Sequence, residues 1–262
     1  LKARDEATRV IEGTVGRLQS VGQGLVSAGK TLTAAVTIPI LAAGGASVKT
    51  FADVEKGMNE VFTLLPGISK DAMGQMTQQV IGFSKEFGVL PKEVIPALYQ
   101  SLSAGVPPDN VFEFMATAQK AAMGGVTDLQ TAVDGISSTV NAFRGQALSA
   151  SEASDLIFTA VRLGKTTVDE LSRSLFNVNP VAAAAGVKFS NVTAALAAMT
   201  AQGVPTSVAT TQLRQLIVEL SKSGTAASDT FKKLAGKTFK DFIASGGDLA
   251  GALAIMEEGA KK

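Results

Sequence analysis

The feature that most constrains the fold is a short phrase, Gly-Val, which recurs along residues 51 to 262. Gly88-Val89, Gly105-Val106 and Gly186-Val187 are each followed five residues later by another valine, and Gly203-Val204 and Gly125-Val126 are looser copies. Glycine suits the left-handed position that ends a helix, and the valine after it suits the hydrophobic contact of that cap. Pro, Thr, Ser or Asp then follows, which are residues that start helices. The phrase therefore predicts short helices joined by tight turns.

No alternating run is long enough for a strand, so we expect an all-α fold, with about ten helices of roughly 8 to 20 residues after residue 50. The expected breaks are Pro66-Gly67, Gly88, Pro107-Pro108, Gly124-Gly125, Gly145, Gly164, Asn179-Pro180, Gly203, Gly224 and Gly246-Gly247. The interval from Gly88 to Gly105 is the same as the interval from Gly186 to Gly203. This repeated spacing favours stacked helical hairpins over a compact multi-helix bundle, which remains the alternative.

Helical periodicity also predicts which side chains are buried. Apolar residues recur at intervals of three and four within their segments, as on the inner face of an amphipathic helix. The residues expected in the core are Leu98, Leu102, Val111, Met115, Val133, Ile136, Val140, Phe158, Leu196, Leu213 and Leu216. The lysines are expected on the opposite, polar faces.

The first 50 residues differ from the rest. All thirteen Phe and the single Tyr lie at Phe51 or later, and aromatic residues dominate core burial. We therefore expect residues 1–50 to form a helical arm and residues 51–262 to form the multi-helix core. The chain runs from Leu1 to Lys262 without a stop signal for its last helix, so we expect it to be part of a longer protein.

The arm contains a seam of apolar or small residues with a mean spacing of 3.5. Its members are Ile11, Val15, Leu18, Gly22, Leu25, Gly29, Leu32 and Val36. This period keeps one stripe facing a partner helix, as in a coiled coil, and the two glycines would let backbones approach closely. We predict that copies of the chain associate through this seam. The alternative is that the arm folds back onto residues 51–262 of its own chain.

The segment Gly24–Thr31, GLVSAGKT, matches the phosphate-binding pattern G-x-x-x-x-G-K-[ST]. A functional phosphate loop follows a buried strand and presents backbone N–H groups to the phosphates. The residues before Gly24 instead carry the helical seam, which places Lys30 beside the seam and toward solvent. We therefore interpret the segment as part of a helix, with nucleotide binding at Lys30 as the less favoured alternative.

Residues 31–48 contain no charge, and the segment is long enough for a membrane span to be considered. Six strongly apolar residues would contribute roughly 2 to 3.5 kcal/mol to insertion, while Pro39, the Gly44-Gly45 pair and several hydroxyls oppose it. A buried or helix-covered segment with a bend at Pro39 is favoured. A membrane-active or pore-forming segment remains the second hypothesis.

Composition argues against catalysis. The chain has no His and no Cys, which removes the usual general base, the thiolate nucleophile and most zinc and iron sites. The adjacent carboxylates Asp169-Glu170 and Glu257-Glu258 are expected on solvated helix surfaces. A net charge of +1, with no cluster of Lys and Arg among aromatics, argues against sequence-specific nucleic-acid binding. We predict no enzymatic activity and no cofactor or metal site.

Several phrases stand in the order found in the core of phage tail tape measure proteins, which roughly residues 15 to 235 resemble. They begin with Thr37-Ile38-Pro39 and Phe51-Ala52-Asp53-Val54-Glu55-Lys56-Gly57-Met58, followed by the Gly-Val series. The later ones are Ser103-Ala104-Gly105, Thr127-Asp128-Leu129, Val140-Asn141-Ala142-Phe143, Val181 to Val187, Ala201-Gln202-Gly203-Val204-Pro205 and Gln212-Leu213-Arg214. Nothing in the chain matches the peptidoglycan-cleaving domains that some family members carry.

The resemblance implies a structural and delivery role in a virion. Such proteins fill the tail tube in several copies, set tail length by their own length, and leave ahead of the DNA to help it cross the host envelope. The partners it implies are other copies of the chain, the tail tube and tail tip proteins, and the host membrane. The implied locations are the tail lumen, the host cytoplasm during assembly and the host envelope on ejection.

Overall fold

The computed structural model describes residues 47–261, and these residues contain helices and turns without any strand. The all-α expectation is confirmed for this part of the chain. The α-helices are α3 (Ser47–Phe62), α4 (Lys70–Phe87), α5 (Pro91–Ser103), α6 (Val111–Gly125), α7 (Leu129–Ala142), α8 (Ala150–Leu163), α9 (Val168–Ser174), α10 (Asn179–Ala184), α11 (Phe189–Ala201), α12 (Thr206–Ser221), α13 (Ala226–Ala235), α14 (Phe239–Ala244) and α15 (Leu249–Ala260). Short 3-10 helices lie at η1 (Pro108–Asn110), η2 (Arg144–Gln146) and η3 (Leu175–Asn177).

The Gly-Val phrase ends helices as expected. Gly88, Gly105, Gly186 and Gly203 all have positive φ angles, between 68° and 93°. The valine after each donates its N–H to the carbonyl five residues earlier, for example Val106 N–H to Ser101 O at 3.0 Å and Val204 N–H to Met199 O at 3.2 Å. This is the bond that defines a Schellman cap. The sequence phrase is therefore a run of helix C-terminal caps.

The same valines also prepare the next helix. Val89 precedes the N-cap of α5, and Val94 is the fourth residue of that helix. A hydrophobic pair at these two positions fixes the angle at which a chain enters a helix. Val94, Val111 and Val192 are all fully buried. The phrases at Gly88, Gly105 and Gly186 thus close one helix and orient the following one, which keeps the turns short.

Val126 departs from this pattern. Here the valine itself, not Gly125, occupies the left-handed region, with φ 52° and ψ 49°, and Thr127 N–H bonds to Ala122 O at 3.0 Å. A Cβ on Gly125 would lie only 2.5 Å from Val168 Cβ, so this glycine serves the close approach of α6 to α9. The cap therefore moves one residue along and falls on a β-branched side chain, for which positive φ is unusual.

We expect Val126→Gly to stabilise the protein by about 1 kcal/mol, because it relieves strain of the kind that costs roughly 1 to 3 kcal/mol per residue. Val126 is 93% exposed, so little packing is lost. Chemical denaturation of both proteins measures the difference in the free energy of unfolding. A decrease in stability would show that Val126 is not strained.

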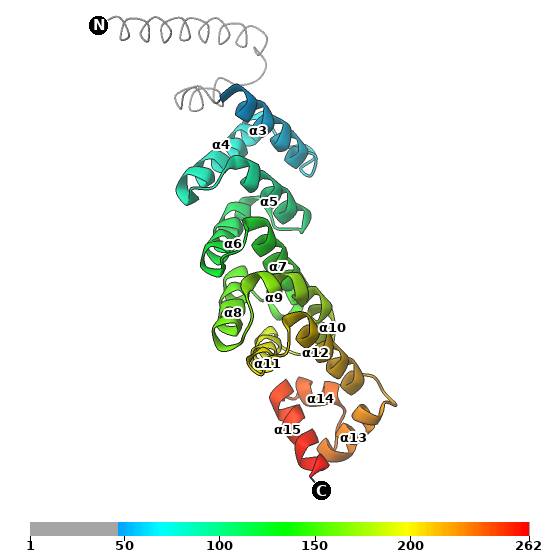
Figure 1. The fold of residues 1–262 in the computed structure, drawn as a ribbon. Coiled ribbons are helices and arrows are strands. Elements are labelled where there is room, and N and C mark those ends of the chain that lie inside the picture. Colours follow the sequence, from blue (N-terminus) through cyan, green and yellow to red (C-terminus); the bar gives the residue numbers. More distant parts are fainter. Residues whose placement is uncertain (1–46, 262) are drawn as a thin grey trace, which may run out of the picture.

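The helices stack in two rows along the length of the molecule (Figure 1). One row contains α3, α5, α7, α9 and α12, and the other contains α4, α6, α8 and α11. The main contacts join each helix to the next in its row and to its neighbours in the chain. The first row is interrupted at Asn179-Pro180, where α9, η3 and α10 replace a single helix. At the far end, α13, α14 and α15 pack around Phe231, Phe239 and Phe242.

The stack has a regular period, which is visible in where its helices begin. In the first row, α5, α7, α9 and α12 begin at residues 91, 129, 168 and 206, and in the second row α6, α8 and α11 begin at residues 111, 150 and 189. The shorter interval from Gly88 to Gly105, which favoured stacked helical hairpins, is therefore not the length of one repeat. It spans one first-row helix, while the equal interval from Gly186 to Gly203 spans one second-row helix. One repeat is a pair of helices, as in other helical solenoids.

Core positions recur with this period. Leu98, Ile136, Leu175 and Leu213 stand at the same place in four successive repeats, and each is at most 2% exposed. Of the eleven residues expected to be buried, Leu102, Val140, Phe158 and Leu216 are half-buried and pack against the core, and the other seven are buried. Every lysine whose exposure is described is exposed. One continuous core thus runs through the stack.

The expected arm, residues 1–50, lies almost entirely outside the described residues. Helix α3 begins at Ser47, before the proposed boundary. Its inner face carries Val54, Met58 and Val61, all buried, while its opposite face is polar and exposed at Glu55 and Asn59. Within residues 47–261, the first helix of the stack thus presents a polar face away from the core.

Candidate functional site

The candidate residues of the arm are not among those that the structure describes. The seam from Ile11 to Val36 and the segment Gly24–Thr31 with Lys30 lie outside the described residues, as does most of the uncharged segment 31–48. Within residues 47–261, no helix is both long and apolar enough to cross a membrane. The same residues contain no cluster of three or more acidic side chains that could hold a metal ion.

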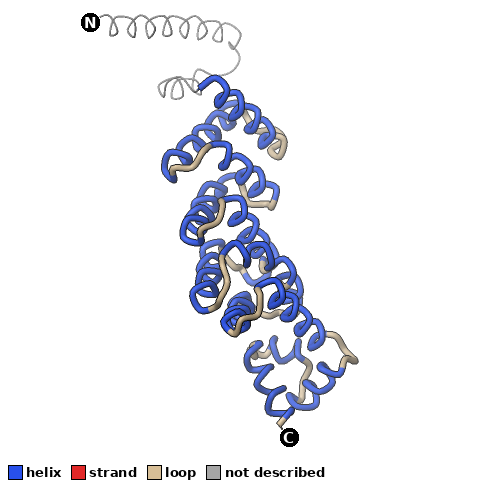
Figure 2. Tube along the Cα trace, in the orientation of Figure 1, coloured by secondary structure: helices blue, strands red, loops and turns tan. Residues whose placement is uncertain are grey.

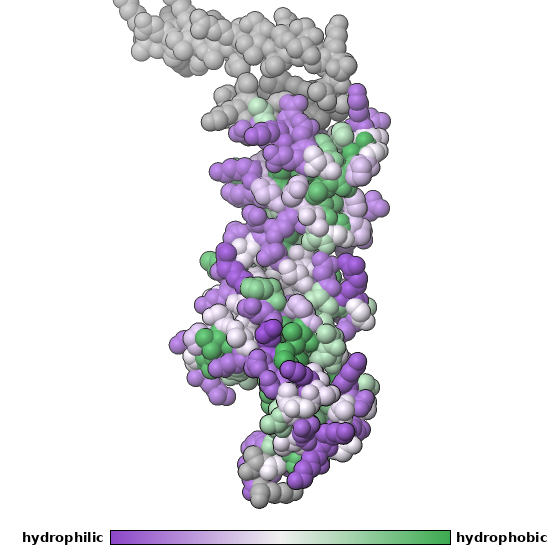
Figure 3. All heavy atoms as spheres, turned by 90° about the vertical axis from the view of Figure 1, so that its right-hand side faces the viewer, coloured by the Kyte–Doolittle hydropathy of each residue, from purple (hydrophilic) through white to green (hydrophobic). Residues whose placement is uncertain are grey.

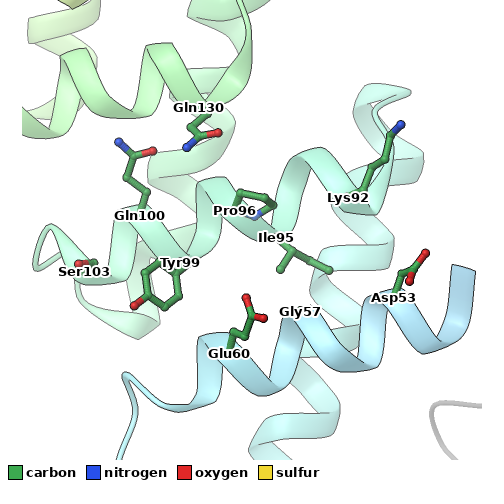
Figure 4. Close-up of a pocket in the computed structure, with 10 residues that line it drawn as sticks. All are labelled: Asp53, Gly57, Glu60, Lys92, Ile95, Pro96, Tyr99, Gln100, Ser103 and Gln130. Atoms are coloured by element: carbon green, nitrogen blue, oxygen red, sulfur yellow. The ribbon is translucent and has the colours of Figure 1, made fainter.

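A groove of about 490 Å³ lies between α3 and α5 (Figure 4). Its apolar floor is formed by Ile95, Pro96 and Tyr99, and its rim by Asp53 and Glu60 of α3 and Lys92, Gln100, Ser103 and Gln130 of the other helices. Gly57 allows α5 to come close, because a Cβ there would lie 2.9 Å from Ile95 Cγ2. The groove has the polar rim and apolar floor of a contact surface, and its lining offers no nucleophile paired with a base.

Polar side chains join each repeat to the next. Their hydrogen bonds connect residues that are separated in the sequence by close to the repeat length. They are Gln100 Nε2 to Asp134 Oδ1 (2.9 Å), Asn141 Nδ2 to Ala104 O (2.7 Å), Thr127 Oγ1 to Asp169 Oδ1 (3.1 Å), Asn179 Nδ2 to Thr139 Oγ1 (3.0 Å), Gln146 Nε2 to Val187 O (3.1 Å) and Thr206 Oγ1 to Glu170 Oε2 (2.8 Å). These directional bonds fix the register between layers that apolar packing alone would leave less defined.

The carboxylates expected as a solvated pair on α9 belong to these contacts. Asp169 accepts from Thr127 and from Arg173, whose Nε lies 3.0 Å from Asp169 Oδ2. Glu170 accepts hydrogen bonds from the hydroxyls of Thr166 and Thr206. The two residues lie on a helix surface as expected, but the expectation missed their role in linking repeats. Glu257 and Glu258 are exposed on α15.

Arg173 joins this network to the start of α7. Its Nη2 donates to Thr131 Oγ1 at 3.1 Å and lies 4.0 Å from Asp128 Oδ2. The hydrogen bond from Arg173 lowers the pKa of Asp169 below its ordinary value. Burial raises the pKa of Asp128, but the hydrogen bonds from Thr131 and the charge of Arg173 outweigh this and lower it overall. The interactions that favour the charged forms of Asp128 and Asp169 therefore also link α9 to the start of α7.

Low pH should therefore lower the stability of the stack. A carboxyl whose pKa is lower in the folded than in the unfolded state stabilises the fold above its unfolded pKa of about 4, and this contribution is lost as the pH falls through the folded pKa. We expect the free energy of unfolding to fall between pH 5 and pH 3. Asp169→Asn removes one such group, so this variant should show a smaller fall over the same interval. Equal falls for both proteins would contradict this assignment.

The surface of the described residues mixes apolar, acidic and basic side chains, and none of these classes dominates it. On the face that forms the right-hand side of Figure 1, apolar patches alternate with hydrophilic side chains from one end of the stack to the other (Figure 3). The described acidic and basic residues are likewise interspersed along the helices. Such a surface suits contacts with other proteins better than tracking of a nucleic-acid backbone.

Comparison with known proteins agrees with this structural character. The chain is 31% identical, over 98% of its length, to a probable tape measure protein of Clostridium phage phiCD119 (strain Clostridium difficile/United States/Govind/2006), of which it spans 29%. It is 24% identical, over 84% of its length, to the tape measure protein of Pneumococcus phage Dp-1, of which it spans 19%. The chain thus corresponds to less than a third of either relative. No solved structure matches it.

The family assignment rests on a longer pattern than any single phrase. The sequence model of the phage-related minor tail proteins matches residues 77–262, which include α5 to α15 and thus every layer of the stack beyond α4. The resemblance to tape measure proteins noted from the sequence phrases is confirmed by both relatives. This chain belongs to the phage-related minor tail protein family and is similar to phage tail tape measure proteins.

Proposed function

We propose that the chain is a structural segment of a tape measure protein that lies in the lumen of a phage tail, contributes to tail length during assembly and assists DNA delivery. The observation that carries this proposal is the similarity to a probable tape measure protein over 98% of the chain. The elongated stack with a continuous core supports a structural role (Figure 1). Its proposed partners are the tail tube and tail tip proteins.

The proposal is tested by removing one repeat from the phage gene. An in-frame deletion of residues 129–167 takes out α7 and α8 and joins the cap before α7 to the start of α9. Tails measured by electron microscopy should be shorter. The shortening should lie between about 10 Å, the spacing of packed helices, and about 58 Å, the length of the deleted residues as one helix. Duplication of the same repeat is the matched control and should lengthen tails. Tails of unchanged length in both mutants would contradict a role in length.

We further propose that copies of the chain meet through the arm. The seam from Ile11 to Val36 keeps a 3.5-residue period, and the arm has no aromatic residue with which to build its own core. Replacing Gly22 and Gly29 by leucine should disrupt a close seam and lower the mass seen in sedimentation. An unmodified chain that sediments as a monomer at about 100 µM, well above the Kd of a micromolar association, would contradict this proposal. A mass unchanged by the substitutions would contradict it equally.

A further inference from the structure

The gap between α3 and α5 differs from the gaps between later helices of the same row. Gln100 Nε2 donates to Asp134 Oδ1 and so joins α5 to α7. Arg173 Nη2 donates to Thr131 Oγ1 and so joins α7 to α9. Among residues 47–261, no side-chain hydrogen bond or ion pair joins α3 to α5. The surface between these two helices instead holds the groove of about 490 Å³.

The floor of this groove presents an aromatic ring beside a proline. Tyr99 is 40% exposed, and Figure 4 shows it on α5 together with Pro96 and Ile95. Pro96 lies inside α5 and has no N–H, so the carbonyl of Lys92 lacks its usual helical donor. Lys92 also lines the groove. Grooves lined by aromatic residues bind extended, proline-containing segments, so this floor suits such a segment.

We propose that residues 37–42 of the same chain, Thr-Ile-Pro-Ile-Leu-Ala, occupy the groove. This segment offers three large apolar side chains and one proline to the apolar floor. It carries no charge, and residues 13–48 as a whole contain two basic and no acidic side chains. The rim of the groove includes the carboxylates of Asp53 and Glu60. The segment therefore brings no repulsive charge to an acidic rim, and its flanks are complementary to that rim.

The connection to α3 is long enough for this contact. Six residues separate Leu41 from Ser47, the first residue of α3, and six extended residues span at most about 20 Å. Gly57, which faces Ile95 in the groove, lies ten residues into α3, about 15 Å along the helix. The Gly44-Gly45 pair supplies residues that suit a tight reversal of the chain direction before α3. Leu41 can therefore reach the level of Gly57.

The short connection favours the chain's own segment over that of a second copy. A short linker holds a binding segment at an effective concentration on the order of millimolar, which a separate copy reaches only at that concentration. Residues 37–42 begin after Val36, the last residue of the seam, so this contact leaves the seam free. The contact would fix where the arm leaves the stack. It does not depend on association through the seam.

Tyr99 reports on the groove directly, because the chain has one Tyr and no Trp. Acrylamide quenching of its fluorescence is compared between the unmodified chain and the variant Ile40→Asp with Leu41→Asp. The proposal predicts at least about twofold stronger quenching in this variant, because a ligand that fills a groove has most of its contact surface buried. The matched control, Val15→Asp with Leu18→Asp, adds the same charge within the seam and should leave quenching unchanged. Unchanged quenching in the first variant, or an equal rise in the control, would overturn the proposal.

The absence of cysteine permits a second test in the full chain. The variant Ile40→Cys with Tyr99→Cys is oxidised, and its disulfide is identified by mass spectrometry. The matched control is Ile40→Cys with Asn59→Cys, since Asn59 is exposed on the opposite face of α3. A disulfide requires Cα atoms within about 7 Å, so the proposal predicts an intramolecular 40–99 disulfide in at least about tenfold greater yield than a 40–59 disulfide. Similar yields would overturn it.

Two further measurements identify the occupant and keep the result independent of the seam. Single variants Ile40→Cys and Tyr99→Cys are mixed and oxidised, and a 40–99 disulfide between chains in a yield equal to the intramolecular one would overturn the proposal in favour of a second copy. The double-cysteine experiment is then repeated with Gly22→Leu and Gly29→Leu in the same chain. Persistence of the intramolecular disulfide supports the contact even if the seam proposal fails, and its loss would overturn the contact.

Discussion

Leu98→Ala is expected to lower the free energy of unfolding by about 2 to 5 kcal/mol, which is the cost of removing a buried leucine and leaving a cavity. Leu98 is fully buried in α5, and the same position is filled by Ile136, Leu175 and Leu213 in the next three repeats. Each of these side chains belongs to the continuous core of the stack. The substitution should therefore also lower the stability of the repeats before and after α5. Chemical denaturation measures the loss.

Leu163→Ala is the matched control for this substitution. Leu163 is 63% exposed at the end of α8, so its truncation should change stability by less than about 0.5 kcal/mol. Hydrogen exchange adds a spatial test, because in a stack the layers next to the cavity should lose protection before distant layers. Similar losses of stability for Leu98→Ala and Leu163→Ala would contradict the assignment of the core.

Gly135→Leu is expected to cost about 1 to 3 kcal/mol or more, the usual penalty for overpacking a core, because backbone stands where the new side chain must go. A Cβ on Gly135 would lie 2.6 Å from Ser172 Cβ and 2.8 Å from Ser172 Cα. Helices α7 and α9 therefore touch nearly backbone to backbone. The larger side chain can be accommodated only if the two layers separate, which thermal unfolding would report as a lower Tm.

Gly82→Ala provides the opposite expectation in the same protein. Gly82 lies within α4, is exposed, and has nothing within 4 Å of the position that a Cβ would take. Alanine is preferred over glycine in a helix by roughly 0.5 to 1 kcal/mol, so this variant should be more stable than the parent. If Gly135→Leu left the Tm unchanged, the close approach of α7 and α9 would be refuted.

The local structure was readable from the sequence because helix ends depend on a few neighbouring residues. Gly88, Gly105, Gly186 and Gly203 take the left-handed conformation expected for them. The breaks at Pro66-Gly67, Gly164, Gly224 and Gly246-Gly247 fall between helices, as expected. The inner faces also followed from spacing, since Leu98, Met115 and Leu196 are fully buried.

The period of the stack is hard to recognise in the sequence. Packing requires an apolar residue at each equivalent position, but it does not require the same residue. Leu98, Ile136, Leu175 and Leu213 share burial and apolar character, and they would align if the sequence were compared with itself at an offset of one repeat. The Gly-Val phrase concealed this period, because it ends helices of both rows. The Gly125-Val126 phrase was misleading about which residue forms the helix cap. The missing side chain of Gly125 allows the contact with Val168, while Val126 forms the cap.

The contacts between repeats could not be predicted from single residues. Thr127 pairs with Asp169, and Asn179 with Thr139, across a full repeat, so their pairing depends on the register of the stack. The groove between α3 and α5 likewise exists only once Gly57 faces Ile95. The seam and Lys30 lie outside residues 47–261, so both remain predictions from the sequence.

The repeat is tested most directly by deleting residues 129–167 from the chain and measuring the product by small-angle X-ray scattering together with circular dichroism. The remaining layers should stack on one another, because Leu129 and Val168 occupy equivalent positions at the start of α7 and α9. We expect an unchanged fraction of helix and a maximum dimension shorter by one helix spacing, about 8 to 10 Å. Loss of helical structure, or a folded protein of unchanged length, would contradict a stack built from two-helix repeats.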